Sequence, residues 1–180
     1  MKGLDDSSKS LTWEQSGKLA SRLVVGGETV ATLTWAKSWG SLATGESADG
    51  EWTLKRSGFL RPRVTVRENG ADSNLAVLSI GWAGEGALVF SDGETFQLKR
   101  SGFWHPEWSI LDSTGRRLLL LKPDLGWKKK QALVEVEDAA AVSKRTSLLA
   151  IVGWYVIILI SDYDYDGGGS AAAVMAASGM

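Results

Sequence analysis

The stretch Ser147–Ser161, S-L-L-A-I-V-G-W-Y-V-I-I-L-I-S, is the longest apolar run in the chain. As a helix, these 15 residues would span roughly 22 Å. A helix with apolar side chains at every angle must be surrounded on all sides, by protein or by lipid. Gly153 and the β-branched residues lower its helix propensity, but a strand of this length would be unusual. We therefore predict a helix over 147–161.

Two surroundings suit such a helix, the interior of a closed β-barrel and a lipid bilayer; an ordinary core helix is a third interpretation. Lys144 and Arg145 precede the run and three aspartates follow it, which suits a C-terminal anchor with its basic side in the cytoplasm. A bilayer core of about 30 Å, however, needs about 20 apolar residues. Length therefore favours the barrel interior, and the membrane anchor is the alternative.

The composition sets wide limits. A chain of 180 residues predicts one domain, over 11–161. The net charge of −1 gives no reason to expect a nucleic-acid partner, and the lack of cysteine excludes disulfides and thiolate chemistry. Residues 1–10 are polar and contain no signal peptide, so we expect a cytoplasmic protein. We predict disorder for 1–10 and for the acidic, Gly- and Ala-rich tail 162–180.

Short apolar runs alternate with turn residues about every ten positions from Leu11 onwards. Asp-Gly and Asn-Gly pairs at 49–50, 69–70 and 92–93 are typical of tight hairpins. This spacing predicts an antiparallel barrel or sandwich, and the need to surround the helix favours a closed barrel of about twelve strands. The expected strand centres are Thr12, Leu23, Thr32, Leu42, Thr53, Thr65, Val77, Leu88, Gln97, Ser109, Leu119 and Val134.

The chain contains an internal repeat with a period of about 44 residues. The segment L-K-R-S-G-F at 54–59 recurs unchanged at 98–103, and D-G-E at 49–51 recurs at 92–94. Two copies of about four strands each indicate that the sheet consists of two related halves. If so, residues 31–70 and 76–115 should superpose as strands in the same order.

Twelve short strands in two related halves, followed by one wholly apolar helix, resemble the tubby C-terminal-like superfamily, which includes tubby proteins, phospholipid scramblases and plant LURP-one-related proteins. The resemblance covers about Leu11–Ser161 and implies a closed barrel around a central helix. It also implies a role at lipids or membranes, without an agreed enzymatic mechanism. The chain matches neither the phosphoinositide-binding residues of tubby proteins nor the calcium segment of the scramblases, so the resemblance assigns no site residue.

The repeated L-K-R-S segments supply most of the candidate site residues. Side chains alternate along a strand, so Arg56 shares a face with Trp52, as Arg100 does with Phe96. Inward-facing aromatic residues would place both arginines at the rim of the core, where each anchors the next turn. The functional alternative is an anion or lipid-headgroup patch. Its candidates are Lys55, Arg56, Arg61, Arg63, Lys99 and Arg100, with the cluster Lys128, Lys129 and Lys130 beside Trp127.

Catalytic and metal sites find little support. His105 is the one histidine in the chain, and there is no cysteine, so a zinc site would have only carboxylates for its other ligands. No Ser-His-Asp triad can be singled out around this histidine. Asp162, Asp164 and Asp166 with Gly167 match the first half of an EF-hand loop, but position 12, normally Glu, is Ala173. We therefore predict no metal and no cofactor. The sequence favours a non-enzymatic binding or scaffold domain for an anionic lipid or membrane surface, cytoplasmic and peripheral to the membrane, with the membrane-anchored β-domain as the alternative.

Overall fold

The computed structural model describes residues 10–38, 40–58, 61–81, 85–102, 104–126, 130–137 and 145–166. For residues 162–166 it describes the backbone alone. They form twelve strands and one helix. The strands are β1 (Ser10–Gln15), β2 (Ala20–Val25), β3 (Glu28–Trp35), β4 (Ala43–Ser47), β5 (Gly50–Ser57), β6 (Arg63–Glu68), β7 (Ala76–Ile80), β8 (Gly86–Phe90), β9 (Thr95–Ser101), β10 (Glu107–Leu111), β11 (Arg117–Leu125) and β12 (Lys130–Val136). The helix is α1 (Thr146–Asp166).

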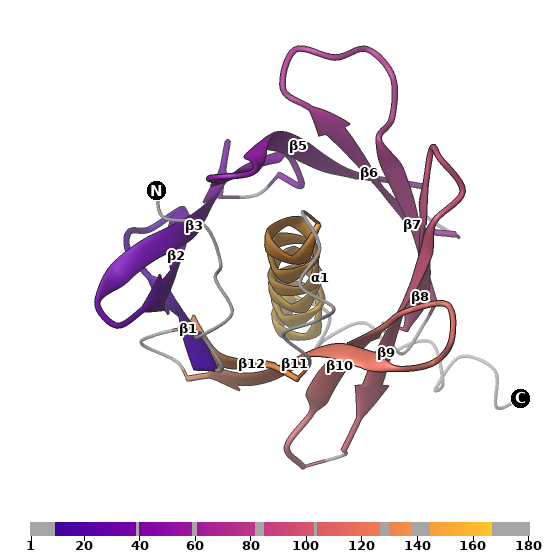
Figure 1. The fold of residues 1–180 in the computed structure, drawn as a ribbon. Coiled ribbons are helices and arrows are strands. Elements are labelled where there is room, and N and C mark those ends of the chain that lie inside the picture. Colours follow the sequence, from indigo (N-terminus) through magenta and orange to yellow (C-terminus); the bar gives the residue numbers. More distant parts are fainter. Residues whose placement is uncertain are drawn as a thin grey trace, which may run out of the picture.

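The twelve strands form a closed antiparallel barrel around α1 (Figure 1). Each strand pairs with its neighbours in sequence, and β1 closes the ring by pairing with β12, with Leu11 opposite Val134. The predicted fold class is therefore confirmed. From Leu148 to Leu159 every residue of α1 is buried, and its side chains are at most 8% exposed, so protein surrounds the apolar run. Among the described residues no helix is long and apolar enough to cross a membrane.

Side-chain alternation along each strand separates the core from the outer surface. In β1, Leu11 and Trp13 are buried while Thr12 is exposed. The inward residues of all strands pack with α1 into one apolar cluster, as expected when strands of period two enclose a helix. Eleven of the twelve predicted strand centres lie inside strands. Leu42 does not, because β4 begins at Ala43, which is the first residue to pair with both neighbouring strands.

Two glycines let the helix approach the barrel wall closely. A Cβ atom added to Gly45 of β4 would lie 2.6 Å from Cγ2 of Ile151, closer than real Cβ contacts. On the helix, a Cβ atom at Gly153 would lie 3.2 Å from Cδ1 of Ile110 and from Cδ2 of Leu121. The missing side chains thus set how near α1 lies to β4 and to the β10–β11 wall.

Both Asp-Gly turns of the repeat contact the start of α1, one at Ser147 and one at Arg145, the residue before the helix. The Ser147 hydroxyl donates a hydrogen bond of 2.7 Å to Asp49 Oδ2. The Arg145 guanidinium donates to Asp92 and Glu94, and its Cζ lies 4.0 Å from the centre of the Phe90 ring. The repeated D-G-E sequence therefore holds the start of the helix in both halves of the barrel.

Aromatic contacts hold the middle of α1. Trp154 stacks on Trp13 of β1 at 6.0 Å between ring centroids, and Tyr155 stacks on Trp35 of β3 at 5.7 Å. The Tyr155 hydroxyl also donates a hydrogen bond to the backbone carbonyl of Ser41. Burial is the main cause that raises the pKa of Tyr155, so the phenol stays a hydrogen-bond donor at every physiological pH.

The observed boundaries differ from the prediction at both ends of the domain. The helix begins at Thr146 and continues to Asp166, so residues 162–166, predicted to be disordered, are helical. At the other end, Ser10, predicted to lie in a disordered segment, is the first residue of β1. Residues 1–9 and 167–180 lie outside the described residues.

Both copies of L-K-R-S end a strand, at Ser57 in β5 and at Ser101 in β9. The glycine that follows has a positive φ in each case, 81° at Gly58 and 78° at Gly102. A Cβ atom on either would lie under 3.0 Å from the backbone carbonyl oxygen three residues later. The turns are thus built alike, while Phe59 and Phe103 lie outside the described residues. The duplication itself stays a prediction that superposition of 31–70 on 76–115 tests.

Candidate functional site

The two ends of the barrel differ in charge. Because successive strands run in opposite directions, the connections after β1, β3, β5, β7, β9 and β11 lie at one end, where α1 also finishes. We call this the basic end. The connections after the even-numbered strands lie at the opposite end, where α1 begins. We call this the acidic end.

Dividing every strand at its midpoint separates the charges whose side chains are described. The basic half carries eleven Lys and Arg against four Asp and Glu, a net charge of +7. The acidic half carries four Lys and Arg against eleven Asp and Glu, a net charge of −7. The cations of the basic half are Lys18, Arg22, Lys37, Lys55, Arg56, Arg61, Arg63, Lys99, Arg100, Lys122 and Lys130. The chain's overall charge of −1 conceals this separation.

The two ends act separately on a partner. Strands of five to nine residues, rising about 3.3 Å per residue and tilted by about 40°, hold the ends roughly 15–20 Å apart. The Debye length at physiological ionic strength is about 8 Å. Screening therefore prevents either end from cancelling the field of the other near the surface.

Every described residue among the predicted anion-binding candidates lies in the basic half. Lys55 and Arg63 are exposed on the neighbouring strands β5 and β6, in whose register Ser57 is opposite Arg63 and Lys55 is opposite Thr65. Arg61 is exposed in the connection between these strands. Lys99 lies on β9 and Lys130 on β12, on other sides of the ring. The candidates thus share one end of the barrel without forming one patch, and Lys128 and Lys129 lie outside the described residues.

The rim position predicted for the two repeated arginines agrees with the burial pattern. Trp52 and Phe96 are buried on the inner face, whereas Arg56 is half-buried and Arg100 is exposed at the strand ends. The Arg100 guanidinium lies 5.8 Å from the ring centre of Trp108, its cross-strand partner. This cation–π contact stabilises the strand pair, so Arg100 has a structural role as well as a surface charge.

Two exposed apolar side chains lie at the basic end. Trp104, between β9 and β10, is 85% exposed, and Leu42, just before β4, is 44% exposed. Five strand positions separate β4 from β9 in the ring, so these side chains lie on opposite sides of the barrel mouth. Our sequence prediction did not assign them to the site.

A sequence pattern could have identified this end. Five of the six connections at the basic end contain Trp or Phe, and none at the acidic end does. The structure describes only Trp104 among them; the others are Trp39, Phe59, Trp82, Phe103 and Trp127. The pattern becomes visible only when the strand order assigns each connection to an end.

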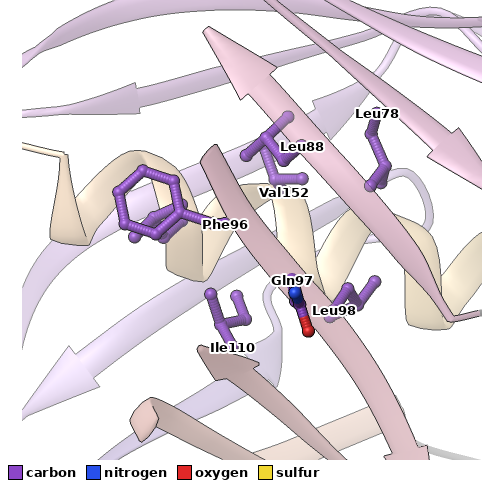
Figure 2. Close-up of a pocket in the computed structure, with 8 residues that line it drawn as sticks. Leu78, Leu88, Phe96, Gln97, Leu98, Ile110 and Val152 are labelled. Carbon is purple, nitrogen blue, oxygen red and sulfur yellow. The ribbon is translucent and has the colours of Figure 1, made fainter. Parts of the chain in front are cut away.

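One small cavity among the described residues offers no polar chemistry. It lies between α1 and the β7–β10 wall and has a volume of about 10 Å³ (Figure 2), which is space for one water molecule at most. No lining side chain is titratable, and all but one are apolar: Leu78, Leu88, Phe96, Gln97, Leu98, Ile110, Leu149 and Val152. A small-molecule substrate has no room there.

The described residues also hold no metal cluster, since no group of three His, Asp or Glu side chains among them is suitably placed. The backbone of 162–166 is helical, whereas a D-x-D-x-D-G calcium loop requires an irregular backbone. His105 is exposed in the connection between β9 and β10.

The fold and the charges together define a closed twelve-stranded antiparallel barrel filled by its own C-terminal helix, with a basic end and an acidic end. Comparisons with protein-family models, with curated proteins and with solved structures found no match to this chain.

Proposed function

We propose that this protein is a non-enzymatic binding or scaffold domain that attaches to a membrane carrying anionic lipid through the basic end of its barrel. The separation of charge between the two ends is the observation that carries the proposal. Each Lys or Arg near an anionic membrane surface contributes about 1 kcal/mol at moderate salt. A net charge of +7 over the described side chains of one end is therefore ample for reversible attachment.

The shape of the basic end supports a flat partner over a small ligand. Its cations are distributed around the ring, and Trp104 and Leu42 lie on opposite sides of the mouth. A planar surface touches both sides at once, whereas a single headgroup or peptide reaches only one. Trp is enriched at membrane interfaces because its ring is amphipathic, so an exposed Trp104 at the end that carries the cations favours a bilayer.

The resemblance to the tubby C-terminal-like superfamily leads to the same proposal, because its members mostly bind lipids or act near membranes. We accordingly propose a cytoplasmic location, peripheral to the membrane. The alternative, a domain anchored by 147–161, requires α1 to leave the barrel. Its burial, the stacked pairs with Trp13 and Trp35 and the ion pairs of Arg145 weigh against that alternative.

Vesicle co-sedimentation tests the proposal with two matched variants. The first variant, Arg61→Gln with Arg63→Gln, removes two positive charges from the basic end. The second, Arg67→Gln with Arg116→Gln, removes two positive charges from the acidic half. On vesicles of phosphatidylcholine with phosphatidylserine, the first pair should lower affinity about 30-fold, from about 1 kcal/mol per cation. The second pair should bind like the wild type. Equal losses in both variants, or equal binding to pure phosphatidylcholine, would refute the proposal.

The lysine cluster provides a second test of the same proposal. Replacing Lys128, Lys129 and Lys130 by Gln should lower binding to the anionic vesicles by roughly two orders of magnitude, at about 1 kcal/mol per lysine. Unchanged binding would show that these three lysines only solvate a turn.

A further inference from the structure

We infer that a second copy of this chain is a partner of the barrel, and that the two copies associate end to end, the acidic end of one on the basic end of the next. The ends carry net charges of +7 and −7 over the described side chains. The chain as a whole carries −1, so copies do not repel one another. This association is independent of the proposed membrane attachment, although both use the basic end.

The anions without ion pairs concentrate on one sector of the acidic end. Glu46, Glu51, Glu68 and Asp72 are exposed on or next to β4, β5 and β6 and make no ion pair with a described Lys or Arg. Most other acids at this end have ion-pair partners: Arg117 pairs with Glu137, and Arg145 pairs with Asp92 and Glu94. The uncompensated charge is therefore directional.

Two of these anions face each other across the sheet. Glu46 of β4 is directly opposite Glu51 of β5 in the strand register. Like charges in this position destabilise an antiparallel pair, and Asn69 Nδ2 donates a hydrogen bond to Glu51 but brings no charge. A cation from another molecule would relieve the repulsion.

The opposite end of the same strands presents the complement. Lys55, Arg61 and Arg63 are exposed on β5, β6 and their connection, and no described Asp or Glu forms an ion pair with them. The anionic and cationic sectors therefore lie at opposite ends of the same strands. Because the strands are tilted, a translation along the barrel axis combined with a rotation about it brings one sector onto the other. Such a head-to-tail contact does not close, so it forms open chains.

Ionic strength controls the association, because exposed ion pairs are weak and screened by salt. Analytical ultracentrifugation should show wild-type oligomers at about 20 mM salt and monomers of 19.3 kDa at about 300 mM. A wild type that is monomeric at the lower salt overturns the inference.

Two variants that each lose one sector give a sharper test. Arg61→Gln with Arg63→Gln should be monomeric at low salt, and so should Glu46→Gln with Glu51→Gln. A 1:1 mixture of the two retains one intact sector of each kind and should form a dimer of twice the monomer mass that grows no further. The control, Glu135→Gln with Glu137→Gln, alters two acids that already have ion-pair partners and should oligomerise like the wild type.

Oligomers in either sector variant alone, or a mixture that stays monomeric, would overturn the inference. All four substituted positions of the two sector variants are exposed, so circular-dichroism melts should show both variants folded and melting no lower than the wild type. The Glu46→Gln, Glu51→Gln variant also separates this inference from the proposed function, because it should bind anionic vesicles normally. Normal vesicle binding by a wild type that never self-associates would refute the inference alone.

Discussion

Replacing Gly45 by Ala should destabilise the protein although it adds a single methyl group. The added Cβ would lie 2.6 Å from Cγ2 of Ile151 and 3.4 Å from its Cδ1. The Cγ2 methyl is bonded to Cβ of Ile151, so it moves only if the side chain leaves its rotamer or the helix shifts. An off-rotamer side chain costs about 0.5–1.5 kcal/mol and overpacking of a core about 1–3 kcal/mol. We therefore expect a loss of about 1–3 kcal/mol and, at about 2–4 °C per kcal/mol, a fall in Tm of roughly 2–12 °C.

A double-mutant cycle on thermal or urea unfolding isolates this contact. Ile151→Leu removes the methyl group on Cβ and should recover about 1 kcal/mol in the Gly45→Ala background. Ile151→Val keeps Cγ2 and should recover much less. Gly17→Ala is the control, because its added Cβ would meet nothing nearer than 3.8 Å. Wild-type stability of Gly45→Ala, or equal rescue by Leu and Val, would refute the close approach of α1 to β4.

Three further outcomes follow from the same structure. Truncation after Lys144 should yield aggregated protein, and Ile157→Asp should unfold the domain at a cost of several kcal/mol; a truncated fragment with a sharp melt and the full β circular-dichroism spectrum would contradict both. The Arg145 hydrogen bond holds the pKa of Asp92 below its ordinary 3.8. The ion pair therefore stabilises the fold above pH 3.8, and this stabilisation is lost as the pH falls through the lowered pKa of Asp92 in the folded protein. Thermal melts of Arg145→Met in acid should lose less stability with falling pH than those of the wild type. Calorimetry should detect no micromolar calcium binding in the wild type, and binding that Asp164→Ala abolishes would prove otherwise.

Local patterns were sufficient to predict the barrel. Alternation such as Leu11-Thr12-Trp13 specifies one buried face per strand, and the Asp-Gly turns join neighbouring strands. The apolar run could not lie at a surface, so a barrel that encloses it was the consistent arrangement. These properties depend on residues close together in sequence, and the structure confirms the fold that follows from them.

The charge separation could not be derived in the same way. Lys55 and Lys99 lie far apart in the chain, and only the up-and-down strand order brings both to the same end. The start of β4 could not be predicted either. Leu42 is as apolar as a strand residue, but strand pairing begins only at Ala43. Trp104 was overlooked for the opposite reason, since an exposed aromatic residue cannot be distinguished from a core residue by type alone.

The direction in which α1 fills the barrel has its own physical cause. A helix that is apolar on every side gives no amphipathic preference for rotation or direction. The stacked aromatic pairs and the close glycine contacts fix its rotation. Its direction follows from the connection with β12, which ends where α1 begins, and from polar contacts at the two ends. The helix N-terminus carries a partial positive charge and lies at the acidic end, where Asp49 accepts a hydrogen bond from Ser147. The C-terminus carries a partial negative charge and lies at the basic end. Arg145 would oppose this arrangement if it were unpaired, but Asp92 and Glu94 neutralise it. The charges that divide the barrel into two ends therefore also favour the observed direction of its central helix.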